Sequence, residues 1–224
     1  MSETLRAVVF DFSGTLFGRL PGHSWLFDGE SALDEGDRAQ VVRALRHPAE
    51  FVDRMTAGQR RDWTDRDVSA EANHRAYREL FRIAGLDETE FPSVYGRLNT
   101  PRHWHPYEDT LPALERLRRT GVAVGVLSNI SWDIREVFVR HGMDRYVAHY
   151  VLSYEEGCAK PDAGLFRTVA RRLGVAPRQC LMVGDDPVCD GAAPEVGMAF
   201  AEVATGPVGV REPVLADALA RYAL

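Results

Sequence analysis

Lysine, cysteine and long apolar runs are the scarcest features of this 224-residue sequence. Only one of its 27 basic residues, Lys160, is a lysine, and the others are arginines. The three cysteines, Cys158, Cys180 and Cys189, are odd in number and lack metal-site spacing, which favours a reduced, cytoplasmic setting. No apolar run approaches the ~20 residues that a membrane span needs, and the first six residues lack the regions of a signal peptide.

The overall composition is that of a globular protein with a substantial core. Hydrophobic residues make up 45% of the sequence and charged residues 27%. The formal net charge of −6 argues against nucleic acid or an anionic membrane as the main partner. We therefore expect a small-molecule partner, while the composition leaves the oligomeric state open.

The sequence contains two kinds of pattern. Residues 5–11 predict a buried strand, whereas residues 17–101 are rich in Arg, Asp and Glu and predict about four helices and no strand, one helix beginning near Thr64. Beyond residue 105, helices alternate with short apolar strands, which predicts a mainly parallel sheet with helices on both faces. The predicted elements there are a helix at 109–119, a strand at 122–127, a helix capped by Ser131, a strand at 150–152, a helix after Pro161, strands at 180–183 and 198–203, and a C-terminal helix.

Polar residues follow the predicted strands at the points where ligands bind to open parallel sheets. The first strand ends at Asp11 and Ser13, the second at Ser128 and Asn129, and Lys160 lies in the loop after the third. Asp185, Asp186 and Asp190 follow the fourth. Carboxylates clustered without matching cations predict a bound metal, and oxygen ligands of this kind suit Mg²⁺. A hydroxyl, an ammonium and backbone N–H groups nearby suit a phosphoryl group.

These residues stand in four ordered motifs that resemble those of haloacid dehalogenase superfamily hydrolases with a helical cap inserted after the first motif. The motifs are Asp-Phe-Ser-Gly-Thr-Leu at 11–16, Val-Leu-Ser-Asn at 126–129, Lys-Pro-Asp at 160–162 and Gly-Asp-Asp-Pro-Val-Cys-Asp at 184–190. The resemblance implies a Rossmann-like α/β core formed by residues 1–16 and 102–224, and an α-helical cap formed by residues 17–101.

The resemblance also implies roles for individual residues. Asp11 is the expected nucleophile, and Lys160 is expected to join its charge to that of the phosphate. The carboxylate of Asp11, the backbone carbonyl of Ser13 and Asp185 are expected to hold Mg²⁺, with Asp190 or Asp186 acting directly or through water. The expected phosphoryl contacts are Ser128 and the N–H of Asn129, with Gly14 and Thr15 of the first motif. Phe17, Arg19 and His23 follow that motif and are candidates for substrate contact.

Ser13 departs from the family pattern. Phosphatases of the superfamily usually carry a second aspartate there, which protonates the leaving oxygen and later activates water. A serine hydroxyl does neither with comparable ease near neutral pH, so the expected loss is of order 10²–10⁴-fold unless the leaving group is good or the cap supplies a base.

Three functions follow as hypotheses. The first is a Mg²⁺-dependent phosphatase acting on a small phosphorylated metabolite through an aspartyl-phosphate intermediate. The second is a metal-independent haloacid dehalogenase, since a halide leaves without a proton. The third is a non-catalytic relative that binds a phosphometabolite.

Overall fold

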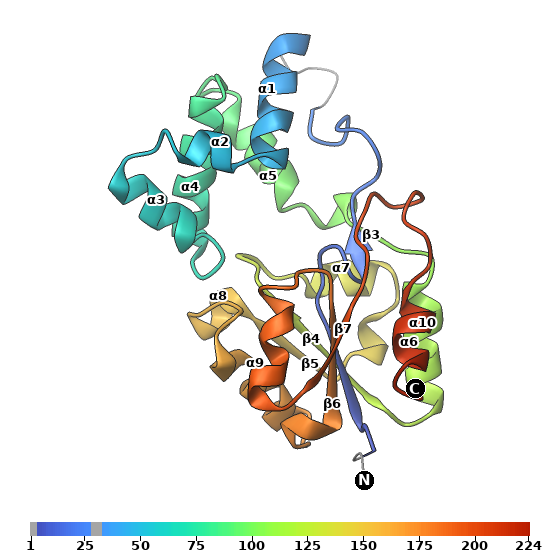
Figure 1. Cartoon of the computed structure of the whole chain (residues 1–224). Coiled ribbons are helices and arrows are strands. Elements are labelled where there is room, and N and C mark those ends of the chain that lie inside the picture. The colour runs from blue at the N-terminus through green and yellow to red at the C-terminus, as the bar shows by residue number, and fades with distance from the viewer. Residues whose placement is uncertain (1–3, 28–32) are drawn as a thin grey trace.

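A five-stranded parallel sheet forms the centre of the protein in a computed structural model that describes residues 4–27 and 33–224 (Figure 1). β1 lies in the middle, where Ala7 pairs with Ala123 on one side and with Cys180 on the other. β1 and β6 are fully buried because helices cover both faces, which explains their unbroken apolar sequences. In spatial order the strands are β5 (His149–Leu152), β4 (Ala123–Ser128), β1 (Ala7–Phe10), β6 (Cys180–Gly184) and β7 (Ala199–Glu202).

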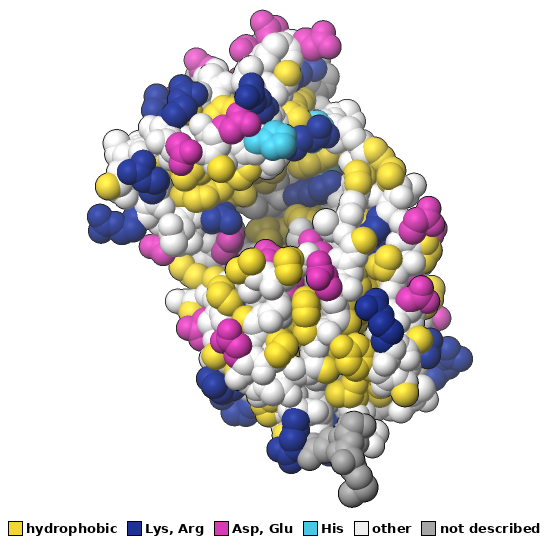
Figure 2. Space-filling view, viewed as in Figure 1, with side chains coloured by type: hydrophobic (Ala, Val, Ile, Leu, Met, Phe, Trp, Pro, Cys, Tyr) yellow, Lys and Arg dark blue, Asp and Glu magenta, His cyan; other side chains and the backbone are white. Residues whose placement is uncertain are grey.

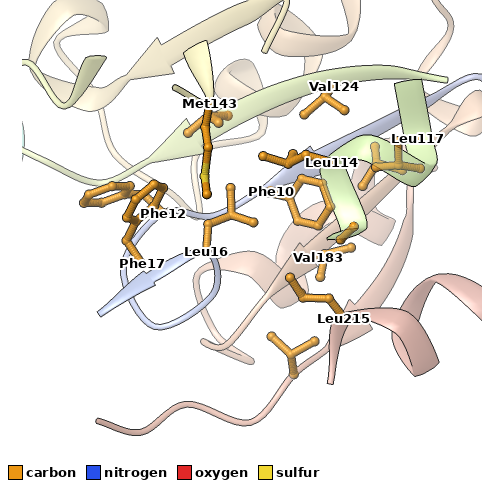
Figure 3. Close-up of a cluster of buried hydrophobic side chains, with 14 of the residues drawn as sticks. Phe10, Phe12, Leu16, Phe17, Leu114, Leu117, Val124, Met143, Val183 and Leu215 are labelled. Atoms are coloured by element: carbon orange, nitrogen blue, oxygen red, sulfur yellow. The ribbon is translucent and has the colours of Figure 1, made fainter. Parts of the chain in front are cut away.

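Each face of the sheet has its own apolar cluster. On one face Phe10, Val124 and Val183 pack with Leu114, Leu117 and Leu215 from the covering helices (Figure 3). On the other, Val9 and Met182 pack with residues of α9 and η4. The prediction of an α/β fold with helices on both faces is confirmed. The covering helices are α6 (Thr110–Arg119), α7 (Arg135–Arg140) and α10 (Leu215–Ala220) on the first face, and α9 (Ala163–Arg172) and η4 (Asp190–Val196) on the second; the remaining short helices of this part are η2 (Asp144–Tyr146), α8 (Ser153–Glu156) and η3 (Pro177–Gln179).

A separate group of helices lies beyond the carboxyl ends of the strands (Figure 1). It has its own apolar cluster, in which Val41, Leu80, Phe81 and Phe91 are buried. The boundaries predicted for the cap, residues 17–101, remain a prediction. The helices are α1 (Glu35–Arg46), α2 (Ala49–Val52), α3 (Ala57–Thr64), α4 (Ala70–Ile83) and α5 (Phe91–Leu98), followed by η1 (Pro101–His103).

Three local predictions were wrong. The segment expected to lack strands contains β2 (Phe17–Gly18), which pairs antiparallel with β3 (His105–Pro106) where the helical group joins the core. The helix expected to be capped by Ser131 begins at Arg135, after Ile134. Thr64 ends α3 instead of starting a helix. Within the described ranges, no helix has the length and apolar character to cross a bilayer.

Candidate active site

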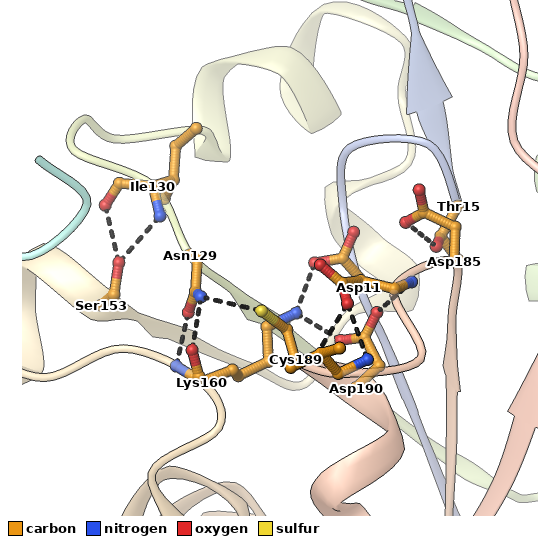
Figure 4. A network of polar contacts seen from close by, with 11 residues as sticks. Asp11, Thr15, Asn129, Ile130, Ser153, Lys160, Asp185, Cys189 and Asp190 are labelled. Atoms are coloured by element: carbon orange, nitrogen blue, oxygen red, sulfur yellow. Dashed lines mark hydrogen bonds and ion pairs between the residues drawn. The ribbon is translucent and has the colours of Figure 1, made fainter. Parts of the chain in front are cut away.

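Lys160 joins two carboxylates at the carboxyl edge of the sheet (Figure 4). Its Nζ lies 2.6 Å from Asp11 Oδ1 and 2.6 Å from Asp190 Oδ1. The side chains of Lys160, Asp11 and Asp190 are only 2%, 9% and 1% exposed, so this triad is almost withdrawn from water. Asp11 continues β1, and Asp190 begins η4 just beyond β6, so neighbouring strands bring the two acids together.

Burial and charge act in opposite directions on this triad. Burial raises the pKa of Asp11 to about 7, and the charges of Asp190 and Asp185 add to the rise while Lys160 opposes it. Burial by itself would lower the pKa of Lys160, but the charges of Asp11 and Asp190 outweigh it and raise that pKa. The lysine is therefore a permanent cation, whereas two acids share a single counter-charge.

Asn129 fixes the backbone that carries this lysine. Its Oδ1 accepts from the backbone N–H of Lys160 at 2.7 Å, and its Nδ2 donates to the carbonyl of the same residue at 2.9 Å. Asn129 immediately follows β4, so the amide links the ends of two loops at the site edge. The side chain of its neighbour Ser128 is 1% exposed and does not line the cavity described below.

Gly14 and Thr15 set the position of Asp185. Thr15 Oγ1 donates to Asp185 Oδ1 at 3.3 Å, although Thr15 is fully buried and lines no part of that cavity. Gly14 has a φ of +87°, and a Cβ there would lie 2.4 Å from Asp185 Oδ2 and 2.7 Å from Thr205 Oγ1. The glycine is required by both its backbone conformation and this close approach.

Three carboxylates meet the requirements of a hard divalent cation. Oxygens of Asp11, Asp185 and Asp190 lie within 4.8 Å of one another, and Lys160 balances only one of the three charges. Both oxygens of Asp190 are already engaged, Oδ1 with Lys160 and Oδ2 with the backbone N–H of Asp186 at 3.1 Å. Asp11 and Asp185 are therefore the more available direct ligands, and Mg²⁺ fits the all-oxygen set.

Asp186 stabilises a turn and is not available to a metal in the same way as Asp185. Its Oδ1 accepts from the backbone N–H groups of Val188 and Cys189 at 2.8 and 2.9 Å, which closes the turn before η4. It does not belong to the carboxylate group that surrounds the candidate metal position. Of the two adjacent aspartates, Asp185 is the one that the structure offers to a metal.

The triad opens into a cavity of about 380 Å³ between the core and the helical group. The space-filling view shows a hollow there, with acidic side chains on its core rim (Figure 2). Ser13 is exposed and reaches this cavity. The core contributes Asp11, Ser13, Asn129, Ala159, Lys160, Asp185, Asp186, Cys189 and Asp190 to its wall, and the helical group contributes Thr64, Arg66 and Asp67.

Thr64 ends α3, whereas Arg66 and Asp67 lie on the loop at residues 65–69, which sequence reasoning missed. We expected a helix to start at Thr64, but the side chain of Ser69 caps α4 by accepting from the N–H of Ala72. Ser69 followed by Ala and Glu is itself an acceptable start signal, and it would have left Arg66 and Asp67 in a loop. The hydroxyl of Ser153, in the core, donates to the carbonyl of Asp67 and so fastens this loop over the cavity.

A second cavity, of about 330 Å³, adjoins the first and shares Ser13 and Asp185 with it. Arg19 and His23 line it, and their contact with substrate remains a prediction. The guanidinium of Arg19 lies 4.3 Å from the ring centre of Trp25 and 3.9 Å from that of Trp104. Burial lowers the pKa of Arg19 to about 9, so it remains a cation near neutral pH. The expectation for Phe17 was wrong, because that ring is fully buried in the core.

Comparison with known families accounts for this arrangement. A family model described as haloacid dehalogenase-like hydrolase matches residues 5–196. The chain belongs to this family. The match contains both the strand-end residues and the helical group inserted between them. This hydrolase therefore has the family expected from its four motifs.

Several similar proteins are named phosphatases. A phosphatase of Mycobacterium tuberculosis is 37% identical over 186 residues, which cover 81% of this chain and 79% of that protein. A glyceraldehyde 3-phosphate phosphatase of Methanopyrus kandleri is 28% identical over 198 residues, covering 81% and 76%. The family and these relatives support a phosphatase-like hydrolase.

Solved structures of a dehalogenase and of an enzyme bound to magnesium and phosphate show the same fold. A dehalogenase with an intermediate complex has a TM-score of 0.69 at 19% identity, covering 97% of this chain and 96% of that one. An enzyme of Bacteroides thetaiotaomicron in complex with magnesium and inorganic phosphate has a TM-score of 0.60 at 18% identity, covering 92% and 98%. At these identities the likeness concerns the fold alone.

Proposed function

We propose that the protein is a Mg²⁺-dependent phosphatase that hydrolyses a small phosphate ester through a phosphorylated Asp11. The observation that carries this proposal is the buried triad of Asp11, Lys160 and Asp190 beside Asp185, facing a cavity. A nucleophilic carboxylate and a phosphate are both anions, so a site that joins them must supply positive charge. Lys160 supplies one charge, and the acidic cluster offers a place for a divalent cation.

The core residues have distinct roles in this proposal. Asp11 attacks phosphorus with the carboxylate oxygen that does not bind Lys160, since Oδ1 is the oxygen that accepts from Nζ. Lys160 holds Asp11 in place and offsets negative charge as the phosphoryl group approaches. Asp190 holds Lys160 from the other side.

Mg²⁺ would be held by Asp11, Asp185 and the backbone carbonyl of Ser13, with Asp190 linked to the site through Lys160 or water. When bound, it would neutralise phosphoryl oxygens and act as a Lewis acid. The N–H of Asn129 and the hydroxyl of Ser128 are the proposed phosphoryl contacts on the β4 side. Because Ser128 is nearly buried in this structure, its contact requires a rotation of its hydroxyl toward the ligand.

The second cavity is suited to the leaving group. It adjoins the triad at Ser13 and Asp185 and presents Arg19, clamped between two indole rings, together with His23. A cation held in this way favours an organic group that carries negative charge or an electron-rich surface. The proposed substrates are therefore small phosphorylated metabolites, with an additional anionic group as the favoured feature.

The acidic cluster favours phosphate transfer over halide displacement. Metal-independent dehalogenation needs one nucleophilic carboxylate and no group of three, whereas Asp185 is positioned by both Thr15 and the Gly14 turn. The named relatives that cover most of this chain are also phosphatases. Dehalogenation and phosphometabolite binding without turnover become outcomes of the test.

The test measures phosphate release from 4-nitrophenyl phosphate with Mg²⁺, with EDTA, and with the Asp11→Asn variant. We expect turnover only with Mg²⁺ and wild-type Asp11, and a mass increase of one phosphoryl group on quenched enzyme. Halide release from 2-haloacids in EDTA would instead establish a dehalogenase. Binding of Mg²⁺ and phosphate without turnover of any activated ester would establish a binding protein.

A further inference from the structure

The cavity has no acid–base group at the position next to the nucleophile. Ser13 lies two residues beyond Asp11 and is exposed to the cavity. An alkoxide or phenoxide leaving group needs a proton, and a water that attacks the phosphorylated aspartate must lose one. Since a serine hydroxyl serves neither step well near neutral pH, another side chain on the wall must do so.

Four of the five carboxylates on this wall are committed to Lys160, to the candidate metal position or to the turn before η4. Asp11 and Asp190 bind Lys160, Asp185 accepts from Thr15 beside the candidate metal position, and Asp186 closes the turn before η4. The fifth is Asp67, on the loop that the helical group extends over the cavity. Its side chain is 26% exposed, so it meets the cavity without being open to bulk water on all sides.

The surroundings of Asp67 favour the protonated form of its carboxyl group. Burial raises its pKa, and the charges of Arg66 and Lys160 only partly oppose this. Tyr77 is the other titratable group coupled to it. An ionised carboxylate facing a phosphate dianion would repel it, whereas a protonated one can donate to the ester oxygen. A carboxyl group with this pKa and this position on the cavity wall is suited to proton transfer.

Several contacts fix the position of the loop over the cavity. The guanidinium of Arg66 donates to the carbonyl of Trp63 at 2.7 Å, lies 4.4 Å from that indole centre, and reaches Asp67 Oδ2 at 3.3 Å. Asn73 Nδ2 donates to the carbonyl of Arg66 at 3.0 Å. With the hydroxyl of Ser153 on the backbone carbonyl of Asp67, the backbone that carries this carboxyl group is tied to both the helical group and the core.

We propose that Asp67 is the general acid and base of the reaction, in place of the aspartate missing at Ser13; this inference rests on the proposed function. In the first step Asp11 forms a bond to phosphorus, the bond from phosphorus to the ester oxygen breaks, and the proton of Asp67 passes to that oxygen. In the second step Asp67 takes a proton from water as the water oxygen attacks phosphorus. The bond from phosphorus to Asp11 then breaks, which releases phosphate and leaves Asp67 protonated again.

Phenyl phosphate and 4-nitrophenyl phosphate provide the decisive comparison, because they differ little in size but greatly in the basicity of the leaving oxygen. We expect Asp67→Asn to lower kcat/KM for phenyl phosphate by about 10²–10⁴-fold, and to lower it less than about tenfold for 4-nitrophenyl phosphate. Wild-type kcat/KM for phenyl phosphate should fall as pH rises through the elevated pKa of Asp67, and this fall should be absent in Asp67→Asn.

Two further variants separate proton transfer from folding. Asp65→Asn makes the same chemical change on the same loop, at an exposed side chain outside the cavity, and should leave both substrates unaffected. Ser13→Asp in the Asp67→Asn background should restore turnover of phenyl phosphate, since it returns a carboxyl group to the position beside the nucleophile. Thermal unfolding of each variant checks that the fold is kept.

The outcomes distinguish this inference from the proposed function. An active wild type with equal losses on both esters in Asp67→Asn, or with no loss, overturns the role of Asp67 and leaves the phosphatase proposal standing. A wild type that releases no phosphate from either ester overturns both. A leaving-group-dependent loss that Ser13→Asp reverses supports the inference.

Discussion

The two walls of the cavity that opens from the triad differ in how they hold their charged groups. The core wall places Asp11, Lys160 and Asp190 in segments that follow the strands, nearly closed to water and joined by contacts of 2.6 Å. The wall from the helical group is one loop whose acid, Asp67, is 26% exposed and is fastened to the core by the hydroxyl of Ser153. The core wall is thus suited to fixed charges, and the other to a group that must exchange protons with ligand and water.

Among changes to the two walls, removal of the lysine should have the largest effect on activity and stability. Lys160→Met leaves two nearly buried carboxylates without their cation, so we expect kcat/KM to fall by about 10³-fold or more. Unpairing buried charges typically costs about 3–5 kcal/mol, and the free energy of unfolding should drop accordingly. Steady-state kinetics and urea unfolding measure the two effects.

Two further variants test whether the site needs a compact cation between its two carboxylates. Asp190→Asn added to Lys160→Met should regain part of the stability and none of the activity, because it removes one stranded charge. Lys160→Arg should stay impaired, since a planar guanidinium does not replace a compact ammonium between two carboxylates. Wild-type activity in Lys160→Arg would contradict this account of the core wall.

Gly14→Ala should damage the core wall next most strongly. The new Cβ would collide with Asp185 Oδ2 at 2.4 Å, so we expect Mg²⁺ affinity to weaken and activity to fall by about 10²-fold. Gly142→Ala is the matched control, because its φ is +65° but nothing lies within 4 Å of the added carbon. It should lose only about 1 kcal/mol of stability from the left-handed backbone. Equal effects of the two changes would exclude a special role for the Asp185 contact.

Mg²⁺ affinity should depend on pH because Asp11, on the core wall, titrates. Burial raises the pKa of Asp11 to about 7, so below that pH a metal must displace its proton. Apparent affinity should therefore rise up to about tenfold per pH unit below pH 7 and level off above it. Calorimetric titrations at several pH values measure this, and Asp11→Asn should flatten the dependence. A flat wild-type profile would show that Asp11 is already ionised throughout.

Ser153→Ala should give the smallest effect and should act on the loop. It removes the donor to the carbonyl of Asp67 and the acceptor that serves the N–H of Ile130 at 2.8 Å. We expect a stability loss of about 1–2 kcal/mol, and faster tryptic cleavage after Arg66 as the loop opens more often. Ser93→Ala, on the exposed side of α5, should change neither. An unchanged cleavage rate in Ser153→Ala would mean that other contacts hold the loop.

The difference between the walls also explains what the sequence could predict. Buried parallel strands are short apolar runs, and their ends are visible as the positions where Asp11, Asn129 and Asp185 begin the loops. The sheet then has to bring these ends to one edge, so the core wall follows from local patterns. Gly14 and Thr15 were predicted as phosphoryl contacts, whereas their action on Asp185 needed coordinates, because it depends on a close approach across the fold.

The loop wall was not predictable by the same reasoning. Arg66 and Asp67 stand in a polar stretch that is compatible with either a helix start or a loop, and no periodicity distinguishes the two. The packing of Arg66 on Trp63 and the tie to Ser153, 86 residues away along the chain, select the loop. The start signal at Ser69 could have left Arg66 and Asp67 in a loop, but the tie to Ser153 joins distant segments and is invisible in local sequence, so the place of Asp67 on the cavity wall emerged only in three dimensions.

The single lysine gives this protein a built-in chemical label. Lys160 holds the one ε-amine of the sequence, and that amine is 2% exposed and fully committed to two acids. Both acids lie on the core with the lysine, so the amine stays a paired cation whatever the position of the helical group, and amine-directed reagents should reach it only when the core itself opens. The rate at which this one side chain becomes acylated or methylated therefore reports how often the core unfolds.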